Sequence, residues 1–115
     1  MNEFLLVIHR DLTSQDARPS QEQIQASVKP FQNWINGLAA KNILVKPPQR
    51  WDVGGRVIRK DNVVTTGPYA EVNKSIGGIL MIRAIDYEEA IDIAKGCPLI
   101  QWGAVVEVRM AMPTM

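Results

Sequence analysis

The segment that decides the fold is TTGPYAEVNKSIGG, which spans Thr65–Gly78. It lies between two strand-like runs, 57–64 and 79–84, and it combines turn residues with one aromatic side chain, one carboxylate and a pair of glycines. Pro68 fits the second residue of a turn, because its ring fixes φ near the value that this position requires. The pattern before the segment predicts the order β-α-β-β, and the pattern after it predicts β-α-β.

The composition is that of an ordinary globular protein. The 115 residues are enough for one domain, 1–115, with a buried core. Apolar residues make up 46% of the chain, which is an ordinary value for a globular protein. The net charge is only +1, so no overall electrostatic field attracts the protein to nucleic acid or to a membrane. The sequence has no long apolar run and no signal-peptide pattern after Met1, so we expect a soluble cytoplasmic protein.

A single cysteine and a single histidine limit metal binding. Cys97 cannot form an internal disulfide, which fits a reducing compartment. Together with His9 it provides too few side chains for a zinc site made of His and Cys, which needs about four ligands. We therefore expect no metal site and no cofactor.

The first third of the chain predicts a strand and a long helix. The apolar residues of the run 3–9 are consecutive rather than alternating, which indicates a strand with both faces buried. Ser20 and Gln23 match a capping box, and Asn42 should end the helix in a left-handed conformation. The helix keeps one apolar stripe in phase across Pro30, so we expect one kinked helix rather than two. The stripe consists of Ile24, Val28, Phe31, Ile35 and Leu38.

The middle of the chain predicts short strands. One strand begins at Ile43–Val45 and should stop at Pro47-Pro48. Asp61-Asn62 fits a tight turn between the strand-like runs 56–60 and 62–65. Gly77-Gly78 should permit a bulge or a close backbone approach just before the next strand.

The last third predicts a strand, a helix and a final strand. The strand is the apolar run 79–82, and Asp86 and Glu89 form a second capping box behind it. Gly96 and Pro98 should terminate this helix. The final strand is expected at 105–109. On that strand Glu107 and Arg109 share one face, which favours an ion pair with cross-strand geometry.

These elements predict an α+β fold with a ferredoxin-like β-α-β-β-α-β order and an extra hairpin. Two helices cover only one face of such a sheet, yet two of its strands are apolar on both faces. A bare apolar face of the order of several hundred Å² is unusual for a monomer. We therefore expect a homodimer in which the two sheets pack face to face.

The central segment resembles the signature of a known family. Thr66–Glu71, TGPYAE, is similar to the D-G-P-F-[AT]-E motif of the DGPF branch of the YCII-related proteins. Ile76–Gly78 resembles the L-G-G that follows, Val106–Arg109 resembles the terminal V-E-V-R, and Asn42–Val45 takes the place of G-V-L-V. The similarity runs from about Phe4 to Arg109.

The resemblance implies a dimeric α+β barrel, in agreement with the strand argument. Related barrels include small enzymes that act on cyclic or aromatic compounds, and heme-handling and ligand-binding members. The broader YCII-related group contains a dehydrochlorinase and is thought to use a His–Asp pair. In this sequence Thr66 replaces the aspartate of the motif, and threonine is not an ionised acid or base near neutral pH.

The candidate catalytic residues are His9 and Glu71. His9 ends an apolar strand, where it either moves protons in an inner cavity or is simply satisfied by backbone or water. Asp11 or Asp52 is the expected partner for catalysis. Glu71 follows the turn of the central segment, where it either acts as a base or accepts N–H bonds that hold its own loop.

The candidate substrate-binding residues lie in loops. Tyr69 is either a wall of the cavity or a packing anchor, and Thr66 stands beside it in the same motif. Arg50 and Trp51 lie in a loop that either rims the pocket, where the guanidinium can meet a carboxylate, or is solvated.

Two functions of different classes fit this sequence. The first is a cofactor-independent lyase or isomerase for a small organic acid or cyclic compound, with His9 as the proton carrier. The second is a non-catalytic small-molecule-binding or accessory module, which the replacement at Thr66 favours. A nucleic-acid role is disfavoured, because no basic stripe is interleaved with aromatics.

Overall fold

The computed structural model describes residues 1–11, 21–49, 55–66 and 74–112. The described elements are β1 (Asn2–Asp11), α1 (Gln21–Ala40), β2 (Leu44–Gln49), β3 (Arg56–Arg59), η1 (Lys60–Asn62), β4 (Val63–Thr66), β5 (Lys74–Ala84), α2 (Tyr87–Ala94), η2 (Pro98–Trp102) and β6 (Val105–Met110). They form a main sheet with the antiparallel order β2-β5-β1-β6 and a separate sheet of β3 and β4. The ferredoxin-like order with an extra hairpin is thus confirmed.

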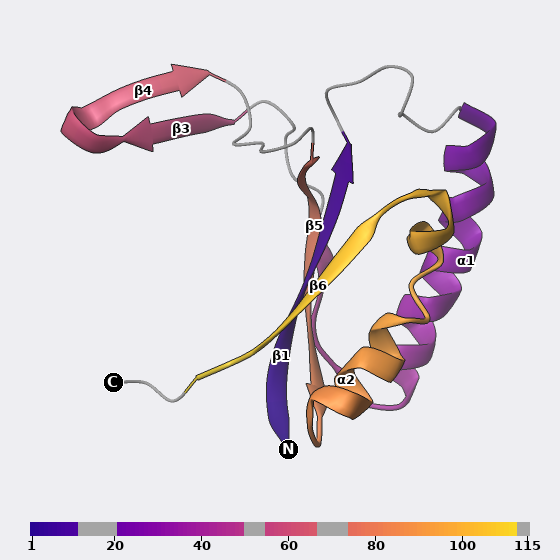
Figure 1. Ribbon diagram of the computed structural model, residues 1–115. Helices are drawn as coiled ribbons and strands as arrows, with labels where there is room; N and C mark the ends of the chain where they lie inside the picture. The colour runs from indigo at the N-terminus through magenta and orange to yellow at the C-terminus, as the bar shows by residue number, and fades with distance from the viewer. Residues whose placement is uncertain (12–20, 50–54, 67–73, 113–115) are drawn as a thin grey trace.

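Both helices lie on one side of the main sheet (Figure 1). The core between them and the sheet is built on alternate residues of the central strands, including Phe4, Leu6 and Ile8 of β1 and Leu80 and Ile82 of β5. These five side chains are at most 2% exposed. The intervening side chains of β1 point to the other face, where Val7 is buried but Leu5 is only partly buried, so the predicted burial is complete on one face and partial on the other.

Helix α1 is one helix that contains Pro30, as the phase of its stripe predicts. The predicted stripe is confirmed at Phe31, Ile35 and Leu38, which lie in or against the core, but Val28 is 48% exposed and Ser27 is buried. Trp34, which is not part of the predicted stripe, also packs against the core and lies so close to Gly96 that a Cβ there would stand 2.8 Å from the indole Nε1. Asn42 has φ 59°, as predicted, and the cap at Ser20 lies outside the described residues.

The prediction that Pro47-Pro48 stops the second strand is wrong, since β2 continues to Gln49. Strand β2 lies at the edge of the sheet, where a residue without an N–H is tolerated because one side of the strand needs no partner. Its register with β5 shifts on both sides of Lys46, which accommodates the prolines.

Strand β5 begins at Lys74, five residues before the predicted start. Its pairing with β1 shifts where Ile8 faces Gly78 and His9 faces Ile76, so Gly77 is the extra residue of a β-bulge. A Cβ at Gly77 would stand 2.7 Å from Cδ of Arg10. The bulge and the close approach predicted for the glycine pair are both confirmed.

The capping box of α2 is present. The Glu89 N–H donates to Oδ1 of Asp86 over 2.9 Å, and Oε1 of Glu89 accepts the N–H of Ile85 over 3.1 Å. The helix ends before Gly96 as predicted, but this glycine does not have positive φ, and its role is the close approach to Trp34. Both residues of the predicted hairpin turn, Asp61 and Asn62, have positive φ, which confirms that turn.

Candidate functional site

The main sheet presents a second face that no described helix covers (Figure 1), and we call it the open face. Its residues alternate with those of the core, so they follow from the strand register. They include Glu3, Leu5, Val7 and His9 of β1, Ile79, Met81 and Arg83 of β5, and Val105, Glu107 and Arg109 of β6. An apolar centre is therefore flanked by polar groups at both ends of the face.

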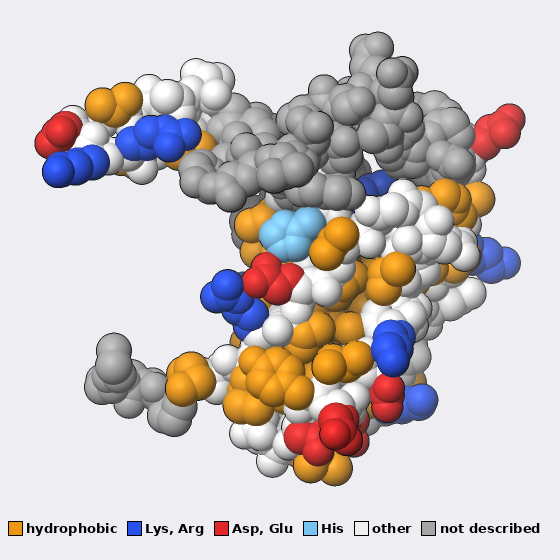
Figure 2. All heavy atoms as spheres, in the orientation of Figure 1, with side chains coloured by type: hydrophobic (Ala, Val, Ile, Leu, Met, Phe, Trp, Pro, Cys, Tyr) orange, Lys and Arg blue, Asp and Glu red, His pale blue; other side chains and the backbone are white. Residues whose placement is uncertain are grey.

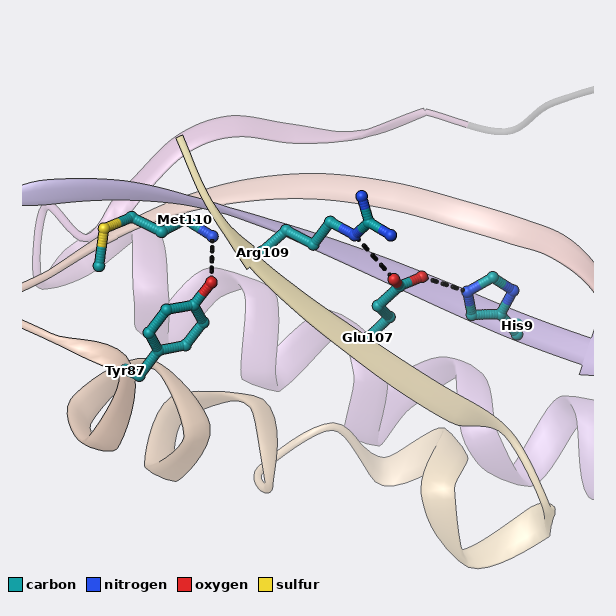
Figure 3. Close-up of polar contacts among 5 residues, drawn as sticks. All are labelled: His9, Tyr87, Glu107, Arg109 and Met110. Carbon is teal, nitrogen blue, oxygen red and sulfur yellow. Dashed lines mark hydrogen bonds and ion pairs between the residues drawn. The ribbon is translucent and has the colours of Figure 1, made fainter. Parts of the chain in front are cut away.

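Three polar side chains of the open face are joined in one hydrogen-bonded set (Figure 3). Nε2 of His9 lies 2.9 Å from Oε1 of Glu107, and Nε of Arg109 donates to Oε2 of the same carboxylate over 2.8 Å. The side chains of His9 and Glu107 are 27% and 38% exposed, whereas that of Arg109 is 72% exposed. We call these residues the His9–Glu107–Arg109 set.

Strand pairing explains how residues so far apart in sequence meet. In the antiparallel pair of β1 and β6, Val7 faces Glu107 and His9 faces Val105. His9 and Glu107 are therefore diagonal neighbours on one face, within reach of long side chains. His9 also borders the bulge at Gly77, which locally bends the strand pair.

The hydrogen bond from His9, followed by the one from Arg109, lowers the pKa of Glu107 below its usual range. The carboxylate is therefore ionised near neutral pH and accepts hydrogen bonds only. It follows that Nε2 of a neutral His9 carries the ring proton, which leaves Nδ1 with a free lone pair. The geometry provides a base at Nδ1 and a carboxylate that stabilises the imidazolium once that base has accepted a proton.

The sequence analysis expects His9 near the end of the first strand, where the structure places it, but does not identify its partner. The expected partners were Asp11, whose side chain is not described, and Asp52, which lies outside the described residues. The observed partner is Glu107. The ion pair of Glu107 with Arg109 is confirmed, although it joins two residues of one strand rather than of neighbouring strands. Glu107 could have been predicted as the partner from two features taken together. The alternation V-E-V-R places Glu107 on one face of the last strand, and the first and last strands of this fold are neighbours.

The other predicted site residues are not brought to this set by a described contact. Thr66 is the exposed last residue of β4 and pairs with Arg56 in the separate two-stranded sheet. Arg50, Trp51, Tyr69 and Glu71 lie outside the described residues, so their roles stay predictions.

Metal-binding side chains do not gather in the described parts of the chain. No group of three or more His, Cys, Asp or Glu residues is placed to hold a metal ion within 1–11, 21–49, 55–66 and 74–112. Within the same residues, neither helix has the length and apolar character needed to cross a bilayer.

The fold and the site together define a small α+β protein with a ferredoxin-like sheet, one face that no described helix covers and a His–carboxylate pair on that face. A family model for the YCII-related domain matches residues 8–112. The chain belongs to the YCII-related family, which confirms the resemblance at the level of the family. Comparison with curated proteins gives no match.

Proposed function

We propose that this protein is a homodimeric acid–base enzyme, a cofactor-independent lyase or isomerase for a small organic acid. The observation that carries the proposal is the His9–Glu107–Arg109 set on the open face. The resemblance of Thr66–Glu71 to the DGPF motif supports assignment to that branch of the family. Cys97 is a buried free thiol, which fits the reducing cytoplasm that we propose as the compartment.

The dimer follows from the face that the helices leave bare. Leu5, Ile79 and Met81 are only partly buried within one copy, and covering apolar surface of this kind contributes about 25 cal/mol per Å². The edges of the sheet are less suited to pairing. Prolines occupy β2 at one edge, and at the other the N–H of Met110 on β6 donates to the Tyr87 hydroxyl over 3.0 Å (Figure 3). A second copy that packs face to face covers the apolar residues and encloses the set.

The reaction begins with a proton on the carbon next to the substrate carboxylate. Nδ1 of His9 takes that proton, and Glu107 stabilises the resulting imidazolium. In a lyase the C–H electron pair forms a double bond while a leaving group departs with its own bonding pair. In an isomerase the proton returns from His9 to a different carbon. Glu71 remains the proposed second acid–base residue, and Tyr69, Trp51, Arg50 and Thr66 the proposed walls.

The substrate class follows from the charges beside the set. Arg109 uses Nε for Glu107, and its two terminal nitrogens retain donors that match the oxygens of a carboxylate. Arg83 is also on this face, but Glu3 lies directly opposite it. Arg109 is therefore the residue that favours a substrate with a negative charge.

The test combines a binding screen with turnover. A panel of small carboxylic acids and phenols is screened by thermal shift, and every binder is tested for conversion. On an identified substrate, His9→Gln should lower kcat about 10²- to 10⁴-fold, while Arg109→Gln should mainly raise KM. Lys41→Gln, at an exposed position after α1, is the control and should leave both constants unchanged. Unchanged turnover in His9→Gln contradicts the proposal.

A second function is favoured by one observation. Thr66 replaces the acidic residue of the family motif, which removes a carboxylate that a catalytic member would use. A non-catalytic small-molecule-binding module would use the same enclosed face. Binding of an acid without conversion, in the wild type and in His9→Gln alike, would support this alternative.

A further inference from the structure

The β3–β4 hairpin is an exposed arm. Its strands pair only with each other in the described residues, and it stands out from the body on the side of the open face (Figure 1). Ile58, Val63 and Val64 are each more than half exposed, and Ile58 lies directly opposite Val64. A two-stranded hairpin on its own is marginally stable in water, so its apolar side chains require a surface to pack on.

The charges of the arm are mainly positive. Residues 56–66 carry Arg56, Arg59 and Lys60 against Asp61, which gives a net charge of +2. These side chains are exposed, and Figure 2 shows basic groups along the hairpin. A surface that suits the arm therefore combines apolar side chains with acidic ones.

The start of α2 is such a surface. Ile85, Tyr87 and Ile91 are exposed apolar residues there. The segment 85–95 has a net charge of −3, because its acids outnumber the single base, Lys95. The acids are Asp86, Glu88, Glu89 and Asp92. We call residues 85–95 the α2 end, and Figure 2 shows acidic groups gathered at this end of the molecule, away from the hairpin.

The arm and the α2 end of one chain are separated from each other. They lie at opposite ends of the sheet. The arm extends on the side of the open face, whereas α2 lies on the other side of the sheet (Figure 1). The arm therefore meets an α2 end only if another copy provides it.

The symmetry of a face-to-face dimer decides which surfaces meet. A two-fold axis along the strands sets one arm beside the other, which brings two positive segments together. An axis across the strands reverses one sheet and sets each arm beside the α2 end of the other copy. The second arrangement pairs opposite charges and covers apolar residues on both sides.

The arm is long enough to span the gap between two packed sheets and so to reach the end of the other sheet, where Ile85 connects β5 to α2. Four residue pairs in strand conformation extend about 13 Å, and packed sheets are about 10 Å apart. We propose that the β3–β4 arm of each copy packs against the α2 end of the second copy and so fixes the relative orientation of the two sheets. This inference rests on the face-to-face dimer proposed above.

The test is cross-linking between the two surfaces. Ile58→Cys and Glu88→Cys are combined in one chain that also carries Cys97→Ala, and a short bis-maleimide is added at micromolar protein concentration. Covalent dimer should form in high yield with the double variant and in low yield with either single variant. The matched control combines Ile58→Cys with Glu22→Cys, an exposed acid at the other end of the helical layer, and should yield little covalent dimer.

A charge exchange gives a second measurement that does not depend on cysteines. Lys60→Glu should weaken the dimer at least about fivefold, and adding Glu88→Lys should restore it. If the wild type is dimeric but the variant with cysteines at 58 and 88 does not cross-link, or cross-links no better than the control with cysteines at 58 and 22, the arm contact is overturned while the dimer remains intact. A monomeric wild type overturns both.

Discussion

Replacement of Gly96 by alanine tests the close packing of Trp34 of α1 against this glycine. The new Cβ would stand 2.8 Å from Nε1 and 3.1 Å from Cδ1 of Trp34, and 3.2 Å from the carbonyl oxygen of Ile93. The indole cannot withdraw freely, because it packs on the core and its ring centroid is 5.8 Å from that of Phe31. We therefore expect Gly96→Ala to be destabilising.

The magnitude follows from two opposing effects. Overpacking of this kind costs about 1–3 kcal/mol, and the reduced freedom of the unfolded chain returns about 0.5 kcal/mol. A net loss of about 1.5 kcal/mol corresponds to a decrease in Tm of about 6 °C for a domain of this size. Thermal unfolding followed by circular dichroism, with urea unfolding for the free energy, measures both quantities.

The matched control is Gly37→Ala, in the exposed part of α1, where a Cβ would meet nothing within 4 Å. This change should stabilise the protein by about 0.5–1 kcal/mol, because glycine is costly inside a helix. Adding Trp34→Phe to Gly96→Ala should cost less than the sum of the two single changes, since the smaller ring makes room for the methyl group. If Gly96→Ala raises Tm as Gly37→Ala does, the packing explanation is refuted.

Three further predictions concern the core, the sheet edge and the site. Leu80 is 1% exposed, so Leu80→Ala should lower the free energy of unfolding by about 2–5 kcal/mol. An unchanged urea midpoint would contradict the core position of Leu80. Tyr87→Phe should remove about 1 kcal/mol and speed hydrogen exchange at the Met110 amide, which loses its acceptor; an unaltered exchange rate would be inconsistent with that bond. Because the folded-state pKa of Glu107 is lowered, its stabilising contribution is present above the unfolded value and is lost as pH falls through the folded value. Urea unfolding at a series of pH values should therefore show a shallower acid loss in Glu107→Gln than in the wild type, and parallel curves would exclude the effect.

Local patterns in the sequence were sufficient for most of the fold. The capping box of Asp86 and Glu89 and the turn at Asp61-Asn62 depend on neighbouring residues, so they are readable before any tertiary contact is known. The bulge at Gly77 is similar, because a glycine pair at the start of a strand has few structural uses.

The incorrect predictions depend on tertiary position. Pro47-Pro48 stops a central strand but not an edge strand, and the position of β2 in the sheet follows only from the complete topology. The stripe of α1 was predicted from periodicity alone, which did not include Trp34, although Trp34 packs against the core and Val28 is 48% exposed. Long-range packing therefore determined what the local pattern could not.

Only one residue of the His9–Glu107 pair was predicted as a catalytic candidate, because the contact between the two depends on long-range strand pairing. His9 was identifiable as the only imidazole of the chain and as a strand-end residue. Its partner Glu107 is 98 residues away, and the register of β1 with β6 decides that these two side chains meet. A carboxylate near His9 in sequence was the natural expectation, but strand pairing provides one from the far end of the chain.

The central claim is that a second copy covers the open face and encloses the His9–Glu107–Arg109 set. Sedimentation equilibrium of the wild-type protein at micromolar concentration tests it most directly. The account predicts a species with twice the chain mass of 12.8 kDa. A single species of 12.8 kDa across that concentration range would contradict it, because the open face would then be bare in solution.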